Sequence, residues 1–248
     1  MLCCANPNAQ KLNLMSKTVT TTLDTQSPAL AHLTEQERAI LREVTMTREY
    51  QTGETIFDEG MPSQHLWFIE RGRVRLYKTA PDGHALTVCI ARTADHFCLG
   101  TCPLFDGDLS PVSAQALEPV VLKLIDKRAV EQHMTQDVKL GMAFGKMMSD
   151  RYRHFTKLTT ALALHCIRVR VADALLCQAG LRGEQTVRGV EMDLDMTQEL
   201  LASCIGTDRA VVARTLLQFE REGILEATGK HITLFDIGAL EKIVHLHT

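Results

Sequence analysis

The sequence predicts an α+β fold: a β-barrel or sandwich, then a long helix, then a small domain of helices and a β-hairpin. Between about residues 53 and 127, short apolar stretches alternate with turn sequences at regular spacing, which is typical of barrels and sandwiches. Over residues 136–164, apolar residues recur at helical spacing without a proline. In the last third, two helical patterns separated by a glycine precede two short strand patterns.

The composition is that of a globular chain. Of the 248 residues, 45% are hydrophobic and 23% are charged, and no apolar run reaches the roughly 18–20 residues that span a bilayer. Residues 1–28 are Ser/Thr-rich and aperiodic, without the basic and apolar regions of a secretion signal. We therefore expect a flexible leader, with Met15 as an alternative start, and a cytoplasmic protein that makes no membrane contact.

Eight cysteines are spread along the chain, and none forms a CxxC pair. A cytoplasmic chain of this length is not expected to contain a disulfide framework, and a zinc ribbon would need CxxC spacing. Cys166, Cys177 and Cys204 lie among helical apolar residues, so we expect them to be buried and unreactive.

Residues 29–134 are assigned to the barrel domain. Strands are expected in the stretches ETIFDEG, HLWFIERGRVRLYK, HALTVCIA and PVVLKLID. The turn sequences ERG and PDG end in Gly72 and Gly83, where a glycine supplies the positive φ that such turns require.

The helix predicted over residues 135–164 carries a wide apolar stripe. Its members are Leu140, Phe144, Met147, Met148, Phe155, Leu158 and Leu162. The stripe is wider than packing on one barrel face requires, which favours a second chain against it and hence a homodimer. An ordinary core helix is the alternative.

Residues 165–248 contain the most informative stretch, DMTQELLASCIGTDRAVVARTLLQFEREGIL. Thr197 is placed to cap a first short helix, and Gly206 to break it. The Thr-Asp pair that follows is placed to cap a second helix, which Gly223 ends. Strand patterns ILEA and HITLF come next. This order predicts a winged helix-turn-helix, with a plain helical hairpin as the alternative.

The second helix is the expected reader of DNA. Arg209 stands at its start and Arg214 faces away from the apolar side, and a guanidinium group can pair with guanine or clasp a phosphate in the major groove. We predict DNA contacts by Thr197, Gln198, Thr207, Arg209, Ala210 and Arg214. Residues 165–248 carry nine Lys or Arg against twelve Asp or Glu, so binding must depend on a local basic face and on two copies acting together.

The order of barrel, long helix and winged helix-turn-helix resembles the cAMP receptor protein/FNR family of bacterial transcription regulators over about residues 30–245. The motifs GETIFDEGMPSQHLWFIERGRVRLYK and IGTDRAVVARTLLQFEREGIL carry the resemblance. It implies a cyclic-nucleotide-binding-type jelly-roll barrel, a dimerisation helix, a palindromic operator in double-stranded DNA, contact with RNA polymerase if the protein activates, and no enzymatic activity. Many members have a glutamate where this chain has Ala210, so the operator should differ there.

The resemblance also directs attention to the barrel wall DHFCLGTCPLFDGDLS. Nucleotide-binding members carry a Gly-Glu pair for the ribose and an Arg-Ser pair for the cyclic phosphate, whereas this chain has Gly100-Thr101 and Ser110-Pro111. Without the arginine and the carboxylate, cAMP loses its charge-assisted contacts, so the sequence disfavours it. The iron–sulfur cluster of the FNR-type sensors is disfavoured as well, because MLCCANPNAQ offers only two adjacent cysteines.

Sulfur chemistry in this wall is the remaining expectation. HFCLGTC resembles the CooA-like, CO-sensing haem branch, which implies Cys98 as a haem iron ligand with His96, His65 or His84 completing the site. A thiol sensor made of Cys98, Cys102 and Cys89, which oxidises or binds a soft ion, is equally compatible with the sequence.

Two alternatives to a sulfur-based sensor stay open. In the first, the cysteines only pack, and another small molecule or nucleotide is the effector. In the second, the chain belongs to a different class, a ligand-binding barrel or an enzyme. That class is disfavoured because no nucleophile–base set or phosphate loop is visible in the sequence.

Overall fold

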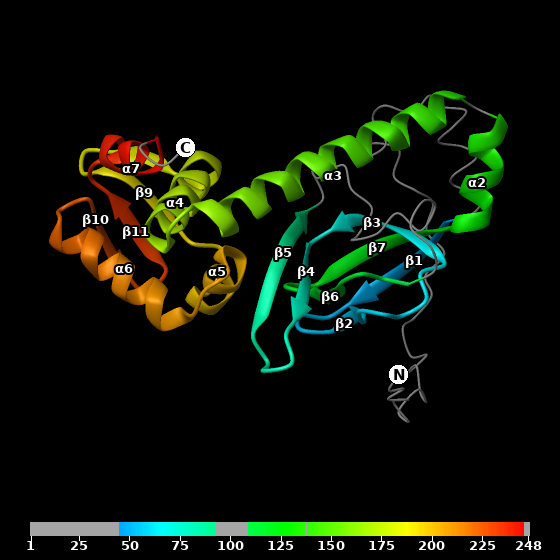
Figure 1. Cartoon of the computed structure of the whole chain (residues 1–248), viewed down its shortest axis with the longest axis horizontal. Helices are drawn as coiled ribbons and strands as arrows, with labels where there is room; N and C mark the ends of the chain where they lie inside the picture. The colour runs from blue at the N-terminus through cyan, green and yellow to red at the C-terminus, as the bar shows by residue number, and fades with distance from the viewer. Residues whose placement is uncertain (1–44, 93–108, 137, 246–248) are drawn as a thin grey trace.

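The computed structural model describes residues 45–92, 109–136 and 138–245, and the predicted α+β fold is confirmed (Figure 1). Within these ranges, no helix combines the length and the apolar character that crossing a membrane requires. The barrel strands are β1 (Thr45–Tyr50), β2 (Thr55–Phe57), β3 (His65–Arg71), β4 (Arg73–Thr79), β5 (Ala85–Arg92), β6 (Ser113–Ala116) and β7 (Val120–Asp126).

Two antiparallel sheets face each other in the barrel. One has the strand order β1-β7-β3 and the other β2-β6-β4-β5. Side chains alternate along β4, so that Val74 and Leu76 enter the apolar core with Leu122 and Leu124 of β7. The strands expected from the sequence are present, but β1 and β6 were not predicted. The β6 sequence SAQA shows why, because small and polar residues give little apolar pattern.

Gly72, between β3 and β4, has a φ of 91°, and an added Cβ would lie 2.6 Å from the carbonyl oxygen of Pro119. Gly53 has a φ of 85°, and no described atom lies within 4 Å of its Cβ position. Both alanine variants bear a left-handed backbone cost of about 1 kcal/mol, and Gly72→Ala should lose about 1–3 kcal/mol more through overpacking. Urea unfolding followed by the fluorescence of Trp67 measures both, and equal losses would contradict the clash.

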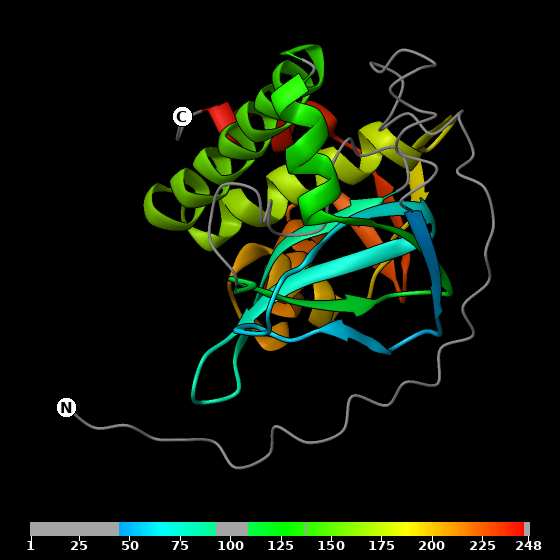
Figure 2. The ribbon, with the colours of Figure 1, turned by 90° about the vertical axis from the view of Figure 1, so that its right-hand side faces the viewer.

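Two helices lead from the barrel to the C-terminal part. α2 (Lys127–Gln136) follows β7, and α3 (Val138–Leu164) then runs past the barrel toward the second group of elements (Figures 1 and 2). The predicted long helix is confirmed as α3. In the predicted stripe, Phe144 is buried and Met148, Phe155, Leu158 and Leu162 are half-buried. Val138, Met142 and Tyr152, which lie outside that stripe, are exposed although they are apolar or aromatic.

The C-terminal part contains α4 (Ile167–Arg182), β8 (Glu184–Thr186), β9 (Gly189–Asp193), α5 (Gln198–Ile205), α6 (Arg209–Arg221), β10 (Leu225–Thr228), β11 (His231–Leu234) and α7 (Ile237–His245). The predicted hairpin is confirmed as β10 and β11, within a sheet of order β10-β11-β9-β8. The strands β8 and β9 and the helix α7 were not predicted. Together these elements enclose a core that includes Leu175, Val212, Phe219, Ile232 and Leu240.

Candidate functional site: the DNA-reading helix and the cavity beside it

The helix-turn-helix is built from local signals that the sequence predicted. The Thr197 hydroxyl accepts a hydrogen bond of 3.2 Å from the backbone N–H of Leu200, which caps α5. Gly206 ends α5 in the left-handed region with a φ of 66°. The guanidinium group of Arg170 on α4 donates to the Ile205 carbonyl, so the C-terminus of α5 is tied to the neighbouring helix.

α6 begins differently from the prediction. Asp208 occupies the N-cap position, but its side chain makes no capping hydrogen bond. The carboxylate instead lies 3.0 Å from Nε2 of His84, which belongs to the turn between β4 and β5. The cap expected from the sequence is therefore wrong at Asp208, because a partner far away in the chain has taken its carboxylate. Gly223 follows the end of α6 with a φ of 70°, as predicted.

The two faces of α6 are separated as the sequence predicted. Val212, Leu216 and Phe219 are buried in the domain core, while Arg209 and Arg214 are exposed on the other side. Nε of Arg209 lies 3.0 Å from Oε1 of Glu199 on α5, and both side chains are more than half exposed. The basic groups are therefore accessible, as contact with DNA requires.

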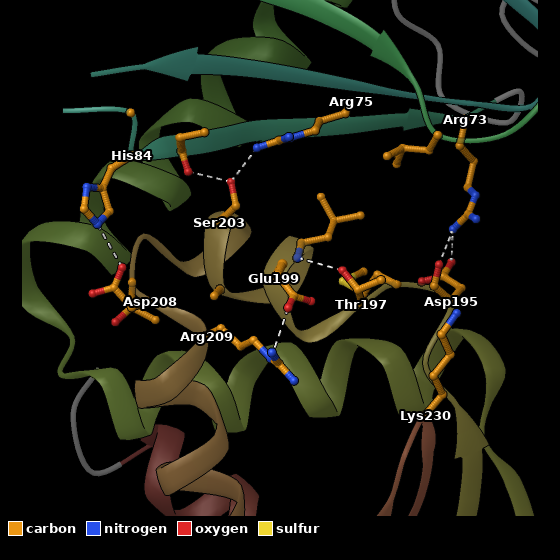
Figure 3. Close-up of a pocket in the computed structure, with 17 residues that line it drawn as sticks. Arg73, Arg75, His84, Asp195, Thr197, Glu199, Ser203, Asp208, Arg209 and Lys230 are labelled. Atoms are coloured by element: carbon orange, nitrogen blue, oxygen red, sulfur yellow. Dashed lines mark hydrogen bonds and ion pairs between the residues drawn. The ribbon is translucent and has the colours of Figure 1, made fainter. Parts of the chain in front are cut away.

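A cavity of about 630 Å³ lies between the β4–β5 hairpin and the helix-turn-helix (Figure 3). Thr197, Thr207 and Arg209 line it, whereas Gln198, Ala210 and Arg214 do not. Its charged lining has both signs and comes from barrel and helix-turn-helix alike, namely Arg73, Arg75, Asp195, Glu199, Asp208, Arg209 and Lys230. Sequence reasoning missed this site, because its two walls lie more than a hundred residues apart in the chain.

Polar contacts join the barrel to α5 along one wall of the cavity. The Ser203 hydroxyl on α5 donates to the Ala85 carbonyl at 2.6 Å and accepts from Nη2 of Arg75 at 2.9 Å. The Thr87 hydroxyl lies 2.8 Å from Ser203 Oγ and accepts from Nε of Arg75, also at 2.8 Å. Because buried polar groups need partners in fixed directions, this network fixes how α5 rests on the β4–β5 hairpin.

His84 provides a pH-dependent contact between the hairpin and α6. Its Nδ1 lies 3.2 Å from Asp82 and its Nε2 3.0 Å from Asp208. The charge of Asp82, with the hydrogen bond and charge of Asp208, raises the pKa of His84 above 6.5. The stability that these contacts of protonated His84 contribute is therefore fully present below pH 6.5 and is lost as the pH rises through the raised pKa.

An NMR titration of His84 should accordingly show a lower pKa in Asp208→Asn than in the unmodified chain. Asp82→Asn is the local comparison, because Asp82 lies on the same turn and acts on His84 whether or not the two domains meet. An unchanged titration in Asp208→Asn would contradict the contact between hairpin and α6.

Most of the expected sensor residues, Cys98, Cys102, His96, Gly100 and Thr101, lie outside the described residues. Cys89 is on β5, and the hydrogen bond with its side chain raises the pKa of His154 on α3. Nε2 of His154 also lies 2.8 Å from the Val88 carbonyl oxygen, at an irregularity in the pairing of β4 with β5.

The candidate haem-binding histidines and the cysteines that were expected to be buried differ in their surroundings. His65 begins β3, and burial lowers its pKa. Both ring nitrogens of His84 face carboxylates, which leaves this residue poorly suited to bind iron. Burial raises the pKa of Cys204 to about 11, as an unreactive thiol requires. Cys166 and Cys177 are exposed, so their predicted burial is wrong.

No group of three or more His, Cys, Asp or Glu side chains in the described part of the chain is arranged to hold a metal ion.

Comparisons with known proteins agree with this architecture. The family profile "Cyclic nucleotide-binding domain" matches residues 47–137, and "Crp-like helix-turn-helix domain" matches residues 169–243. A "CRP-like cAMP-activated global transcriptional regulator" of Mycobacterium tuberculosis is 26% identical over 84% of this chain and 88% of its own length. A "Global nitrogen regulator" of a Nostoc species is also 26% identical, over 85% of this chain and 94% of its own length.

A solved structure of a CooA mutant from Carboxydothermus hydrogenoformans covers 91% of this chain and 98% of its own, with a TM-score of 0.72 and 21% identity. At that identity the likeness concerns the fold alone. The profiles place a nucleotide-binding-type barrel and a Crp-like helix-turn-helix in the order that the structure has, and the relatives span most of the chain. The chain belongs to the cAMP receptor protein/FNR family of transcription regulators, and it is not an enzyme.

Proposed function

We propose that the chain is a homodimeric, effector-controlled regulator that acts in the cytoplasm and binds a palindromic operator with one α6 per protomer. The observation that carries this proposal is the position of Arg209 and Arg214 on the exposed side of a helix whose opposite side is buried. Such a helix can enter the major groove while the rest of the domain contacts the backbone. If the protein activates transcription, RNA polymerase is a further partner.

Selection from random double-stranded DNA tests this function. We expect recovery of a sequence with two inverted half-sites separated by about one helical turn, because two-fold symmetry of the protein is mirrored in its operator. Recovery of no common sequence by the protein, with and without candidate effectors, would remove the proposal.

The proposed dimer interface is α3. Val138, Met142 and Tyr152 are 77%, 71% and 74% exposed in the single chain, which is costly for a helix that faces only water. A second α3 packed against it would cover such side chains. Light scattering should give twice the 27.6 kDa mass of one chain, and a monomer at micromolar concentration would contradict the interface.

We propose that cAMP is not the effector. Arg73, Arg75 and Arg92, the arginines of β4 and β5, contact the helix-turn-helix region, and the position at which nucleotide-binding members carry the phosphate-binding arginine holds the buried Ser110. An uncharged serine at that position gives a cyclic phosphate no charge-assisted contact. Calorimetry should show binding no tighter than millimolar, and a micromolar dissociation constant would overturn this part of the proposal.

The proposed sensor is the cysteine pair Cys98 and Cys102, either through haem on Cys98 or through direct thiol chemistry. The absorption spectrum of the freshly purified protein separates the two, since a Soret band appears only with haem. Cys98→Ser should then uncouple DNA binding from the signal, because a serine hydroxyl does not ionise at neutral pH. Cys166→Ser and Cys177→Ser are suitable controls, since both thiols are exposed and lie on α4 or just before it. Unchanged switching in Cys98→Ser and Cys102→Ser would leave these cysteines with a packing role.

A further inference from the structure

Asp195 carries a buried carboxylate on which three arginines converge. Its side chain is only 6% exposed, and its Oδ2 lies 2.8 Å from Arg73, 3.0 Å from Arg92 and 2.7 Å from Arg182. Neither carboxylate oxygen accepts a well-aligned hydrogen bond, so the attraction is chiefly that of opposite charges. In a buried site such charges are weakly screened, and removal of one member leaves the others without compensation.

The barrel arginines in this cluster oppose each other. Arg73 and Arg92 are register partners across β4 and β5, an arrangement in which like charges destabilise a sheet. Arg73 also lies 2.8 Å from Glu118, which offsets part of the repulsion. The carboxylate of Asp195, which comes from the other domain, supplies the second negative charge at this point. A negative charge of the helix-turn-helix region therefore compensates the positive charges of the two barrel arginines.

Asp195 lies close in the chain to the start of the helix-turn-helix, so the cluster can affect the position of α5. Asp195 lies two residues before Thr197, the residue that caps α5. Nη1 of Arg73 also donates to the backbone carbonyl of Asp195 at 2.9 Å, so the main chain at this point is held as well as the side chain (Figure 3). Further along α5, Ser203 makes hydrogen bonds to Arg75 and to the Ala85 carbonyl of the barrel.

We propose that Asp195 is a positioning residue: held by Arg73 and Arg92 of the barrel and by Arg182 of α4, it sets where the helix-turn-helix rests on the β4–β5 hairpin. Its importance for regulation rests on the proposed DNA-binding function. The cluster holds the start of α5 and the Ser203 network holds its second half, so together they define one docked position. A change in the barrel that moves β4 or β5 is transmitted to α5 through these contacts.

Hydrogen–deuterium exchange of the full chain, measured without DNA, tests the proposal in both directions across the interface. Arg92→Gln alters only the barrel, and Asp195→Asn preserves the size and polarity of the side chain. We expect each variant to raise exchange by about tenfold or more at the weaker-protected amides of both β5 and α5, because docking protects both. Exchange in α7, none of whose residues lines the cavity, should not change.

Matched controls exist on each side of the interface. Asp193→Asn removes a carboxylate two residues away, where the partner is the half-exposed His231. Arg71→Gln removes an exposed arginine at the end of β3. Neither control should alter exchange at the interface. If Arg92→Gln leaves α5 unchanged, the cluster does not position the helix-turn-helix and the proposal fails, whatever the outcome of operator selection.

Discussion

Replacement of Arg209 or Arg214 with alanine should weaken binding to the selected operator by about 1–3 kcal/mol each, or roughly 5- to 150-fold. Both side chains are exposed on α6, opposite the face that the domain core buries. A guanidinium group can make two hydrogen bonds to the edge of a guanine. When the group is removed, the complex loses both bonds and the base is left without a partner. Mobility shifts at fixed salt concentration measure the effect.

Arg221→Ala is the matched control for these variants. Arg221 lies in the last turn of the same helix and is exposed, but it is far from the N-terminal half that we propose enters the groove. We expect it to change affinity less than Arg209→Ala or Arg214→Ala, and nearly equally for specific and random DNA. If both arginine variants bind the operator like the unmodified chain, α6 is not the DNA-reading helix.

Phe219→Ala should destabilise the C-terminal domain by about 3–5 kcal/mol, the range measured for large aromatic deletions in cores. Phe219 is completely buried at the centre of the domain core, and the guanidinium of Arg168 stacks 4.6 Å above its ring. The variant removes this stacking and leaves a cavity between α4, α6 and the sheet. Because α6 is part of the same core, operator binding should fall with stability.

The control for Phe219 is Leu217→Ala on the same helix. Leu217 is 50% exposed and should cost less than about 1 kcal/mol. Far-UV circular dichroism follows the helices, while the fluorescence of Trp67 follows the barrel separately. We expect Phe219→Ala to lower the midpoint of unfolding followed by circular dichroism much more than the midpoint followed by Trp67 fluorescence. Equal effects of Phe219→Ala and Leu217→Ala would show that α6 is not anchored through Phe219.

Much of the fold follows from local signals in the sequence. The cap at Thr197 and the glycines at 206 and 223 act through residues within one helical turn, so they are visible in a short window. The period of apolar residues placed α3 and the buried face of α6 for the same reason. Strands β1, β6, β8 and β9 escaped the prediction, because short or polar strands depend on the neighbours with which they pair.

The wrong predictions share a physical cause. Cys166 and Cys177 lie in an amphipathic region, yet the core side of α4 is made by Val169, Val171, Ala172, Leu175 and Gln178, and the two thiols fall outside that face. Asp208 has the residue type and position of a helix cap, yet its carboxylate is held by His84. In both cases the outcome depends on which distant segment packs against the helix, and a short stretch of sequence does not show that.

The sequence by itself determined the family architecture, the helix-turn-helix and the exposed arginines of α6, because periodicity, caps and turns are interactions between near neighbours. Only the tertiary structure decided how the two domains meet. The cavity lies between the two domains, and the Ser203 network and the contacts of Arg73 and Arg92 with Asp195 join residues more than a hundred positions apart. Nothing in either segment alone specifies its partner. A charged or hydroxyl-bearing residue in the sequence does not show which partner it will contact, because the partner comes within about 3 Å only in the folded chain.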